Sequence, residues 1–192
     1  MTINEKHKRY YNWLNQVKED IIDPDLPIID PHHHLWHGDN QLAGSFPYLM
    51  EQLSEDTNSG HNIIGTIFME CAQGYYLNDN EKYKPVGETE FVINIIEESK
   101  NISGPTNILG IISFADLMLG SEVKDVLDQH IITGKGLFKG IRHAAGWDHN
   151  NEIQNSHSNP VKNIYHESSF KKGAEELIKL NLTFDAWHYH HQ

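Results

Sequence analysis

The stretch Ile28-Ile29-Asp30-Pro31-His32-His33-His34-Leu35-Trp36 joins a short apolar run to a group of polar side chains. Apolar residues bounded by prolines predict a β-strand at its start. Because side chains alternate between the two faces of a strand, we expect Asp30, His32 and His34 on one face and His33 on the other. Neutral histidine is a common ligand of zinc and other divalent metals. The D-x-H-x-H pattern therefore favours His32 and His34 as metal ligands over histidines that only pack.

The composition limits the class of protein. A chain of 192 residues is long enough for one medium-sized domain with a real core. Its formal net charge of -12 argues against binding to nucleic acids or to anionic membranes, which requires surfaces rich in Lys and Arg. Cys71 is the single cysteine, so no intrachain disulfide can form. The start of the chain is polar, and no apolar run is long enough to span a membrane, so we expect a cytoplasmic protein.

Apolar segments of strand length alternate with segments of helical periodicity along the chain. The predicted strands are residues 27–30, 63–69, 107–114, 137–141 and 182–187. The predicted helices are residues 10–22, 46–53, 88–99, 123–131 and 170–178. Strands that alternate with helices in this way indicate βαβ units and a parallel sheet.

Polar side chains follow the carboxyl end of each predicted strand. They are His32 and His34, Glu70, Asp116, Arg142 and His143, and His188 and His190. A (β/α)8 barrel assembles its active site at this end of the strands. An open, doubly wound sheet also binds ligands there. The glycine-rich motifs that bind nucleotide phosphates follow none of the strands, which argues against the nucleotide-binding versions.

Several short blocks of the chain, taken together and in order, resemble the amidohydrolase-related (amidohydrolase 2) family. The family comprises predicted metal-dependent hydrolases with a TIM-barrel fold, related to sugar lactonases and dicarboxylate lactonases. The blocks are Pro27 to Trp36, Ser59-Gly60-His61-Asn62, Phe68-Met69-Glu70-Cys71, Pro85 to Val92, Phe114-Ala115-Asp116-Leu117, Gly140-Ile141-Arg142-His143 and Phe184-Asp185-Ala186-Trp187. The resemblance covers the chain from about Asp25 to its last residue.

The resemblance implies roles for the polar residues. His32 and His34 would bind a divalent metal, Zn or Mn, or would be relics of such a site, because some lactonase relatives work without a metal. Arg142 and His143 would face the substrate, and the fork of Arg142 suits a carboxylate. His190 matches the histidine of the family's Y-H-P-Q block, where this chain has Tyr189-His190-His191-Gln192 and so lacks the proline.

Other residues keep more than one interpretation at this stage. Glu70 is a metal ligand, an acid–base group or an ordinary hydrogen-bonded carboxylate, and we group it with His143 and His190 as a candidate catalytic residue. Asp116 either caps the following turn or contacts the substrate. Trp36 is a candidate substrate contact at the mouth of the barrel, with packing as the alternative. We expect Cys71 to pack rather than to act as a nucleophile, and the sequence assigns no role to His157.

The predicted fold class is α/β, a (β/α)8 barrel of the TIM type that is truncated after about five strands. A leading helix would lie within residues 1–24, and residues 25–192 would form the first five βα units. TIM barrels typically need about 250 residues, and the resemblance implies further site residues on strands six to eight. The outer strands would expose unpaired backbone groups. We therefore expect little hydrolase activity from this chain alone.

These observations predict a hydrolase that acts on a lactone, ester or amide bond of a small polar or carboxylated substrate, with assistance from a metal. One alternative is a decarboxylase or hydratase on the same scaffold. Another is an inactive fragment that pairs with a complementing chain or with a second copy of itself to complete the barrel.

Overall fold

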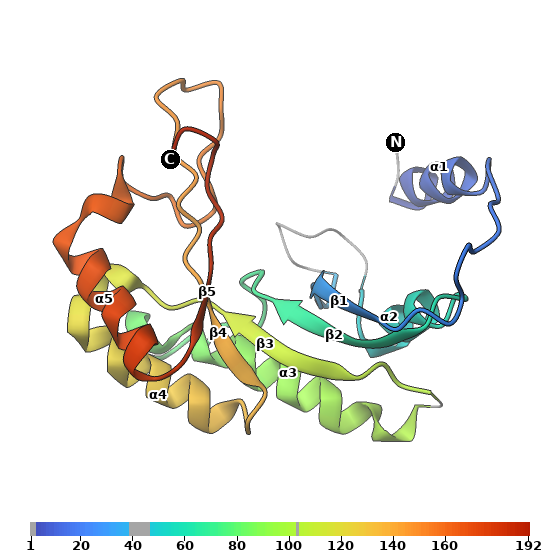
Figure 1. Cartoon of the computed structure of the whole chain (residues 1–192), viewed down its shortest axis with the longest axis horizontal. Helices are drawn as coiled ribbons and strands as arrows, with labels where there is room; N and C mark the ends of the chain where they lie inside the picture. Colours follow the sequence, from blue (N-terminus) through green and yellow to red (C-terminus); the bar gives the residue numbers. More distant parts are fainter. Residues whose placement is uncertain (1–2, 39–46, 103) are drawn as a thin grey trace.

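A curled, all-parallel β-sheet forms the centre of the protein (Figure 1). The computed structural model describes residues 3–38, 47–102 and 104–192. The five strands are β1 (Ile28–His33), β2 (Ile63–Met69), β3 (Ile108–Ser113), β4 (Phe138–Arg142) and β5 (Thr183–Asp185). They pair in sequence order, from β1 to β5. The sheet therefore has the shape of a half-barrel, and the prediction of an α/β fold with a parallel sheet is confirmed.

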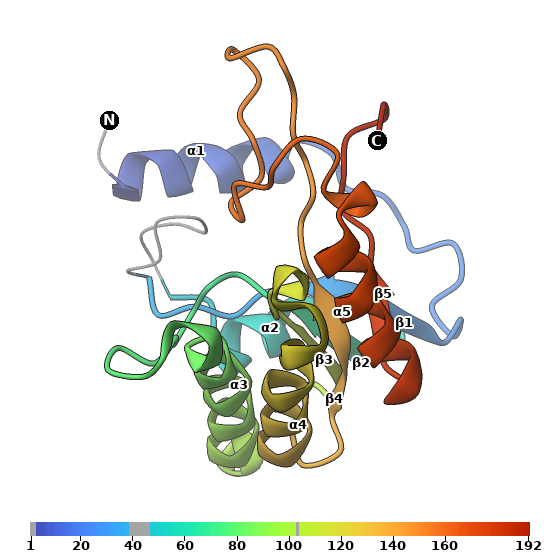
Figure 2. The same ribbon diagram turned by 90° about the vertical axis from the view of Figure 1, so that its left-hand side faces the viewer.

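The helices that follow the strands cover the outer side of the sheet, and a leading helix precedes the first strand. The α-helices are α1 (Ile3–Leu14), α2 (Met50–Thr57), α3 (Val86–Glu98), α4 (Val123–Thr133) and α5 (Ser168–Lys179). The short 3-10 helices are η1 (Glu81–Tyr83), η2 (Ser99–Asn101), η3 (Leu117–Glu122) and η4 (Ile164–His166). Figure 2 shows α3 and α4 side by side, whereas α1 stands apart from them. Among the described residues, no helix has the length and apolar character needed to cross a bilayer.

The core lies between the sheet and these helices and has two parts. In the first, Phe68 of β2 and Ile111 of β3 have no exposed surface and pack with Val92 of α3. In the second, Leu127 of α4 and Ile141 of β4 are fully buried and belong to a cluster that also contains residues of η3 and α5. Burying a side chain of this size contributes about 1.5–3 kcal/mol relative to exposing it.

A buried chain of polar groups joins α3, β3 and α4. Thr89 Oγ1 lies 2.6 Å from Ser113 Oγ and 2.8 Å from His130 Nδ1, and His130 Nε2 lies 3.1 Å from the carbonyl oxygen of Phe114. Since a carbonyl oxygen can only accept, Nε2 of His130 carries the proton, and Thr89 donates to Nδ1. Burial lowers the pKa of His130 to about 4, so the ring stays neutral in the fold.

The leading helix is the clearest error of the sequence-based prediction. The sequence predicted a helix over residues 10–22, but α1 spans Ile3–Leu14. The Asn15 amide group donates to the carbonyl oxygen of Tyr11, and Asn side chains that bond nearby backbone groups compete with helix continuation. Val17 is 69% exposed and Ile22 is 100% exposed, so no core lies beneath this segment to extend the helix.

Smaller differences concern β1 and α2. The first strand extends three residues beyond its predicted end and includes Pro31. Since β1 pairs only with β2 among the described residues, the missing N–H of a proline is tolerated there. The helix predicted over residues 46–53 begins at Met50 and continues to Thr57, while Phe46 lies outside the described residues.

Candidate active site

A cavity of about 250 Å³ lies at the carboxyl ends of the strands. Its walls come from residues that follow β1, β2 and β5, from the last residue of β4 and from the loop between β4 and α5. They are His34, Trp36, Glu70, Cys71, Arg142, His157 and Trp187. Four of these residues, His34, Trp36, Glu70 and Arg142, were predicted as site residues. The parallel sheet thus brings together side chains that are more than 100 residues apart in the sequence.

The histidines of the first strand are arranged as its alternation predicts. His32 Nε2 and His34 Nε2 are 3.1 Å apart, while His33 is buried on the other face and packs against Phe68. His34 Nδ1 lies 2.7 Å from the carbonyl oxygen of Met69 and therefore donates to it. In the neutral ring this leaves Nε2 of His34 unprotonated. Burial lowers the pKa of both histidines, and the positive charge of Arg142 adds to the effect.

The histidine pair would supply two nitrogen atoms to a metal, whereas a catalytic zinc usually has three protein ligands. Among the described residues, no group of three or more His, Cys, Asp or Glu side chains is arranged to hold a metal ion. These residues therefore do not form a complete catalytic metal site by themselves. The expected binding of Zn or Mn stays a prediction.

Glu70 lies directly after β2 and is almost completely buried. His157 Nε2 lies 3.1 Å from each of its carboxyl oxygens. Arg142 Nη1 is 3.8 Å from Oε1. A buried carboxylate is costly unless charged or hydrogen-bonding groups compensate it. His157 donates to Oε2 and Arg142 places positive charge near Oε1, although Oε1 has no hydrogen-bond partner among the described residues. Sequence reasoning missed His157, because its loop position gives no sign that it meets a residue 87 positions earlier.

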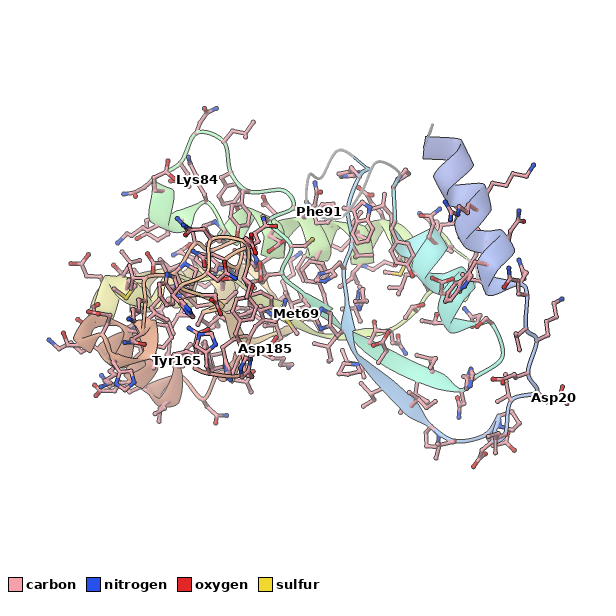
Figure 3. All side chains as sticks on the ribbon, turned by 90° about the horizontal axis from the view of Figure 1, so that it is seen from above. Asp20, Met69, Lys84, Phe91, Tyr165 and Asp185 are labelled. Carbon is pink, nitrogen blue, oxygen red and sulfur yellow. The ribbon has the colours of Figure 1, made fainter. Side chains whose placement is uncertain are left out.

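Arg142 is held by an acidic partner on the neighbouring strand. Its Nε and Nη2 atoms each lie 2.8 Å from Oδ2 of Asp185, and the arginine is 6% exposed. The edge of the guanidinium that we expected to bind a substrate carboxylate is therefore occupied by Asp185. Nη1, the nitrogen nearest Glu70, remains for a substrate. Figure 3 labels Asp185 and Met69, the residue before Glu70, towards the middle of the molecule.

His143 and Asp116 lie beside this cavity rather than in its wall. His143 is buried, and its Nδ1 accepts a hydrogen bond of 3.2 Å from the backbone N–H of Leu117. Burial lowers its pKa, against the opposing charge of Asp116. Asp116 Oδ1 accepts from the backbone N–H of Met118 at 2.9 Å, so Asp116 caps η3. Asp116 was predicted either to cap the following turn or to contact the substrate, and the structure shows it as a cap.

The remaining predicted residues divide between the cavity and the surface. Trp36 lines the cavity and stacks on Tyr48, with 5.5 Å between the ring centroids. His190 is exposed beyond β5, where its ring meets that of His191, and it is not among the cavity-lining residues. Trp187, which sequence reasoning did not select, lines the cavity and leaves no room for a side chain at Gly146.

A second buried carboxyl group supports the loop after β2. Glu88 is fully buried at the start of α3, and its Oε1 accepts from the backbone N–H groups of Cys71 and Gln73, each at 2.8 Å. Burial, with the nearby charge of Glu70, raises the pKa of Glu88 to about 8. Burial also raises the pKa of the Cys71 thiol, which is consistent with a packing residue rather than a nucleophile.

Comparisons with known proteins add nothing to this geometry: no protein-family model, no curated protein and no solved structure matches the chain. The resemblance to the amidohydrolase-related family therefore rests on the sequence blocks alone.

Proposed function

We propose that this protein is a hydrolase related to the amidohydrolase-related family and that it acts on a lactone, ester or amide bond of a small polar or carboxylated substrate. The observation that carries the proposal is the buried carboxylate of Glu70, set between Arg142 and His157 in the wall of a small cavity. A carboxylate, an imidazole and a guanidinium around one cavity can move a proton and stabilise negative charge, which carbonyl hydrolysis requires.

The half-barrel supports the same interpretation at the level of the fold. We propose that the five strands are the first part of a (β/α)8 barrel, since they are parallel, pair in sequence order and carry the polar residues at their carboxyl ends. The size of the cavity suits a small molecule rather than a polymer.

The side chains around the cavity suggest how a substrate would sit. Nη1 of Arg142 would bind a carbonyl or carboxylate oxygen, because the opposite edge of the guanidinium is held by Asp185. Trp36 and Trp187 would contact the rest of the molecule. His34 also lines this cavity and adds a polar side chain to its wall.

Binding of a sugar acid tests the proposed position of the substrate. D-galactonate, the hydrolysis product of a sugar lactone, should bind saturably and change the fluorescence of the tryptophans. The double variant Arg142→Gln/Asp185→Asn removes both charges of this ion pair together, so that Asp185 is not left unpaired, while His157 still contacts Glu70. We expect it to weaken binding by about 10- to 100-fold, because a hydrogen bond to a charged group contributes about 1.5–3 kcal/mol.

Glu97→Gln is the matched control, since Glu97 pairs with Lys135 on the exposed helical side. It should bind galactonate like the unaltered chain. Equal affinity in the double variant and the control would contradict the placement of the substrate at Arg142.

The two edge strands of the sheet suggest that the protein also assembles with another chain. Among the described residues, β1 pairs only with β2 and β5 pairs only with β4. We propose that a strand-bearing segment, from a complementing chain or a second copy, pairs with these edges, because exposed strand edges promote association. Sedimentation velocity over a range of protein concentrations tests pairing between two copies of the chain. If two copies pair, a dimer should form as the concentration rises.

A further inference from the structure

Hydrogen bonds hold the loop between β4 and α5 in place on both sides of His157. Ser156 Oγ donates to the carbonyl oxygen of Ala144 at 3.1 Å, and Ser158 Oγ donates to the same oxygen. The backbone N–H of Ser156 also donates to the carbonyl oxygen of Gly146 at 2.8 Å. Ala144 is fully buried, so the anchor itself is part of the core. The residue between the two serines is thereby held in a fixed place.

His157 reaches from this anchor into the cavity and contacts Glu70. The Glu70 side chain has no exposed surface, whereas the side chain of His157 is 30% exposed and lines the cavity. Nε2 of His157 lies 3.1 Å from each oxygen of Glu70. Of the two groups, the imidazole is therefore the one that a substrate or a water molecule can approach more freely.

A carboxylate that accepts a hydrogen bond from one ring nitrogen of histidine fixes the tautomer and stabilises the imidazolium that forms when the other nitrogen takes a proton. Here Glu70 accepts from Nε2, so Nδ1 of the neutral His157 ring is unprotonated. Resting on the hydrolytic function proposed above, we propose that His157 is the acid–base catalytic residue of this site and that Glu70 is its positioning residue.

His143, one of the two histidines that the sequence predicted as catalytic, is less suited to this role. Its Nδ1 already accepts from the backbone N–H of Leu117, and the ring lies between Phe114 and Phe170, with centroids 5.2 and 5.5 Å away. It does not line the cavity. His157 does line it and carries the carboxylate partner.

The proposed reaction balances without a further reagent. A water oxygen attacks the carbonyl carbon of the substrate while Nδ1 of His157 takes one water proton. The carbonyl oxygen becomes negative and faces Nη1 of Arg142. When the carbonyl re-forms, the bond from carbon to the ring oxygen of the lactone breaks, and the imidazolium returns the same proton to that oxygen. The product is the open hydroxy acid, and His157 is neutral again.

Kinetics on the best-hydrolysed member of a panel of sugar 1,4-lactones test this assignment. We expect His157→Ala to lower kcat by about 100-fold or more, the usual contribution of a general base, with little change in KM. Added imidazole should restore part of the lost rate in His157→Ala, but none in Glu70→Gln, which retains its own imidazole.

Two further variants separate catalysis from structural support. His157→Gln retains an N–H donor for Glu70 but has no base, so it should be as slow as His157→Ala. His166→Ala removes an exposed histidine near the end of the same loop and should leave the rate unchanged. A His157→Gln variant with the original rate, or a His157→Ala variant with no loss or no rescue, would overturn the catalytic role.

The contact between His157 and Glu70 can also be tested by an experiment that does not require catalytic turnover. Diethyl pyrocarbonate modifies accessible imidazoles, and mass spectrometry reports the rate at each histidine. We expect His157 to react several-fold faster in Glu70→Leu than in the unaltered chain, because the leucine cannot hold the ring. Equal rates would overturn the dyad. Absence of lactone turnover by the unaltered chain would instead overturn the hydrolytic function, and with it the catalytic role, while leaving the pairing measurable.

Discussion

Glu88 shows how strongly a single side chain depends on its surroundings. One of its oxygens accepts two backbone N–H groups, while the other is buried and has no hydrogen-bond partner among the described residues. Glu70 adds a second carboxyl group nearby. A charged Glu88 would be poorly compensated there, which accounts for a pKa of about 8.

Stability should therefore change with pH through Glu88. Its pKa in the fold lies above the unfolded value of 4.5, so the folded state binds the proton more tightly. The stabilisation is fully present below pH 4.5 and is lost as pH rises towards 8. Since each pKa unit corresponds to about 1.4 kcal/mol, we expect a loss of a few kcal/mol. Urea unfolding at pH 5 and pH 8 measures it.

Glu88→Gln is the control for this prediction, because the amide cannot ionise. The buried His33 and His130 act in the opposite direction, since their lowered pKa values, about 4 each, make stability rise with pH up to about 6.5. Both histidines are present in each protein, so the difference between the two pH slopes isolates Glu88. Identical slopes would show that Glu88 is ionised in the fold.

At the level of residues, the sequence predicted the members of the site that directly follow a strand. His34, Glu70 and Arg142 were selected because a parallel sheet gathers its carboxyl ends, and they do line one cavity. His157 and Asp185 were not assigned, because their roles depend on contacts between distant segments. Neither a polar loop nor a strand-end aspartate reveals its partner locally.

Among the helices and strands, those with strong local signals were predicted best. β2 has its predicted bounds, and α4 begins at the predicted Val123 and ends two residues beyond the predicted end, at Thr133. A turn capped by Asp116 was one of two predicted interpretations, but the extent of the 3-10 helix η3 was not predicted, because it depends on packing against α5. The loop after β4 carries no periodicity that would place His157.

The contact between α5 and η3 depends on the absence of a side chain at Gly173. A Cβ atom there would lie 2.4 Å from the carbonyl oxygen of Leu117 and 2.9 Å from its Cα. Backbone atoms cannot move aside cheaply, so we expect Gly173→Ala to destabilise the protein by about 1–3 kcal/mol, although alanine favours helices. Urea unfolding measures the loss, and the exposed Lys171→Ala is the control. A Gly173→Ala protein at least as stable as the original would contradict the close packing.

For the whole molecule, alternation of apolar segments predicted the parallel sheet and its class, because burial on both faces gives such strands continuous apolar character. It could not predict how far the sheet curls or where α1 lies, since both depend on contacts between elements. The interpretation of the sheet as part of a closed barrel remains a proposal.

The order of the strands predicts a gradient of protection from hydrogen exchange. β3 is paired on both sides, whereas β1 and β5 each have one neighbour among the described residues. We expect backbone amides of β3 to exchange slowest and those of β5, the shortest strand, to exchange much faster. Mass spectrometry of peptic fragments resolves the strands. Protection of β5 equal to that of β3 would show that its outer edge is covered.

The function proposed for the cavity around Glu70 is the hydrolysis of a small carbonyl substrate. The most direct measurement is proton release from a panel of sugar 1,4-lactones, recorded with a pH indicator for the unaltered chain and for Glu70→Gln side by side. We expect turnover of at least one lactone, slow for this chain alone, that falls by about 100-fold or more in Glu70→Gln. Equal rates for the two proteins across the whole panel would contradict it.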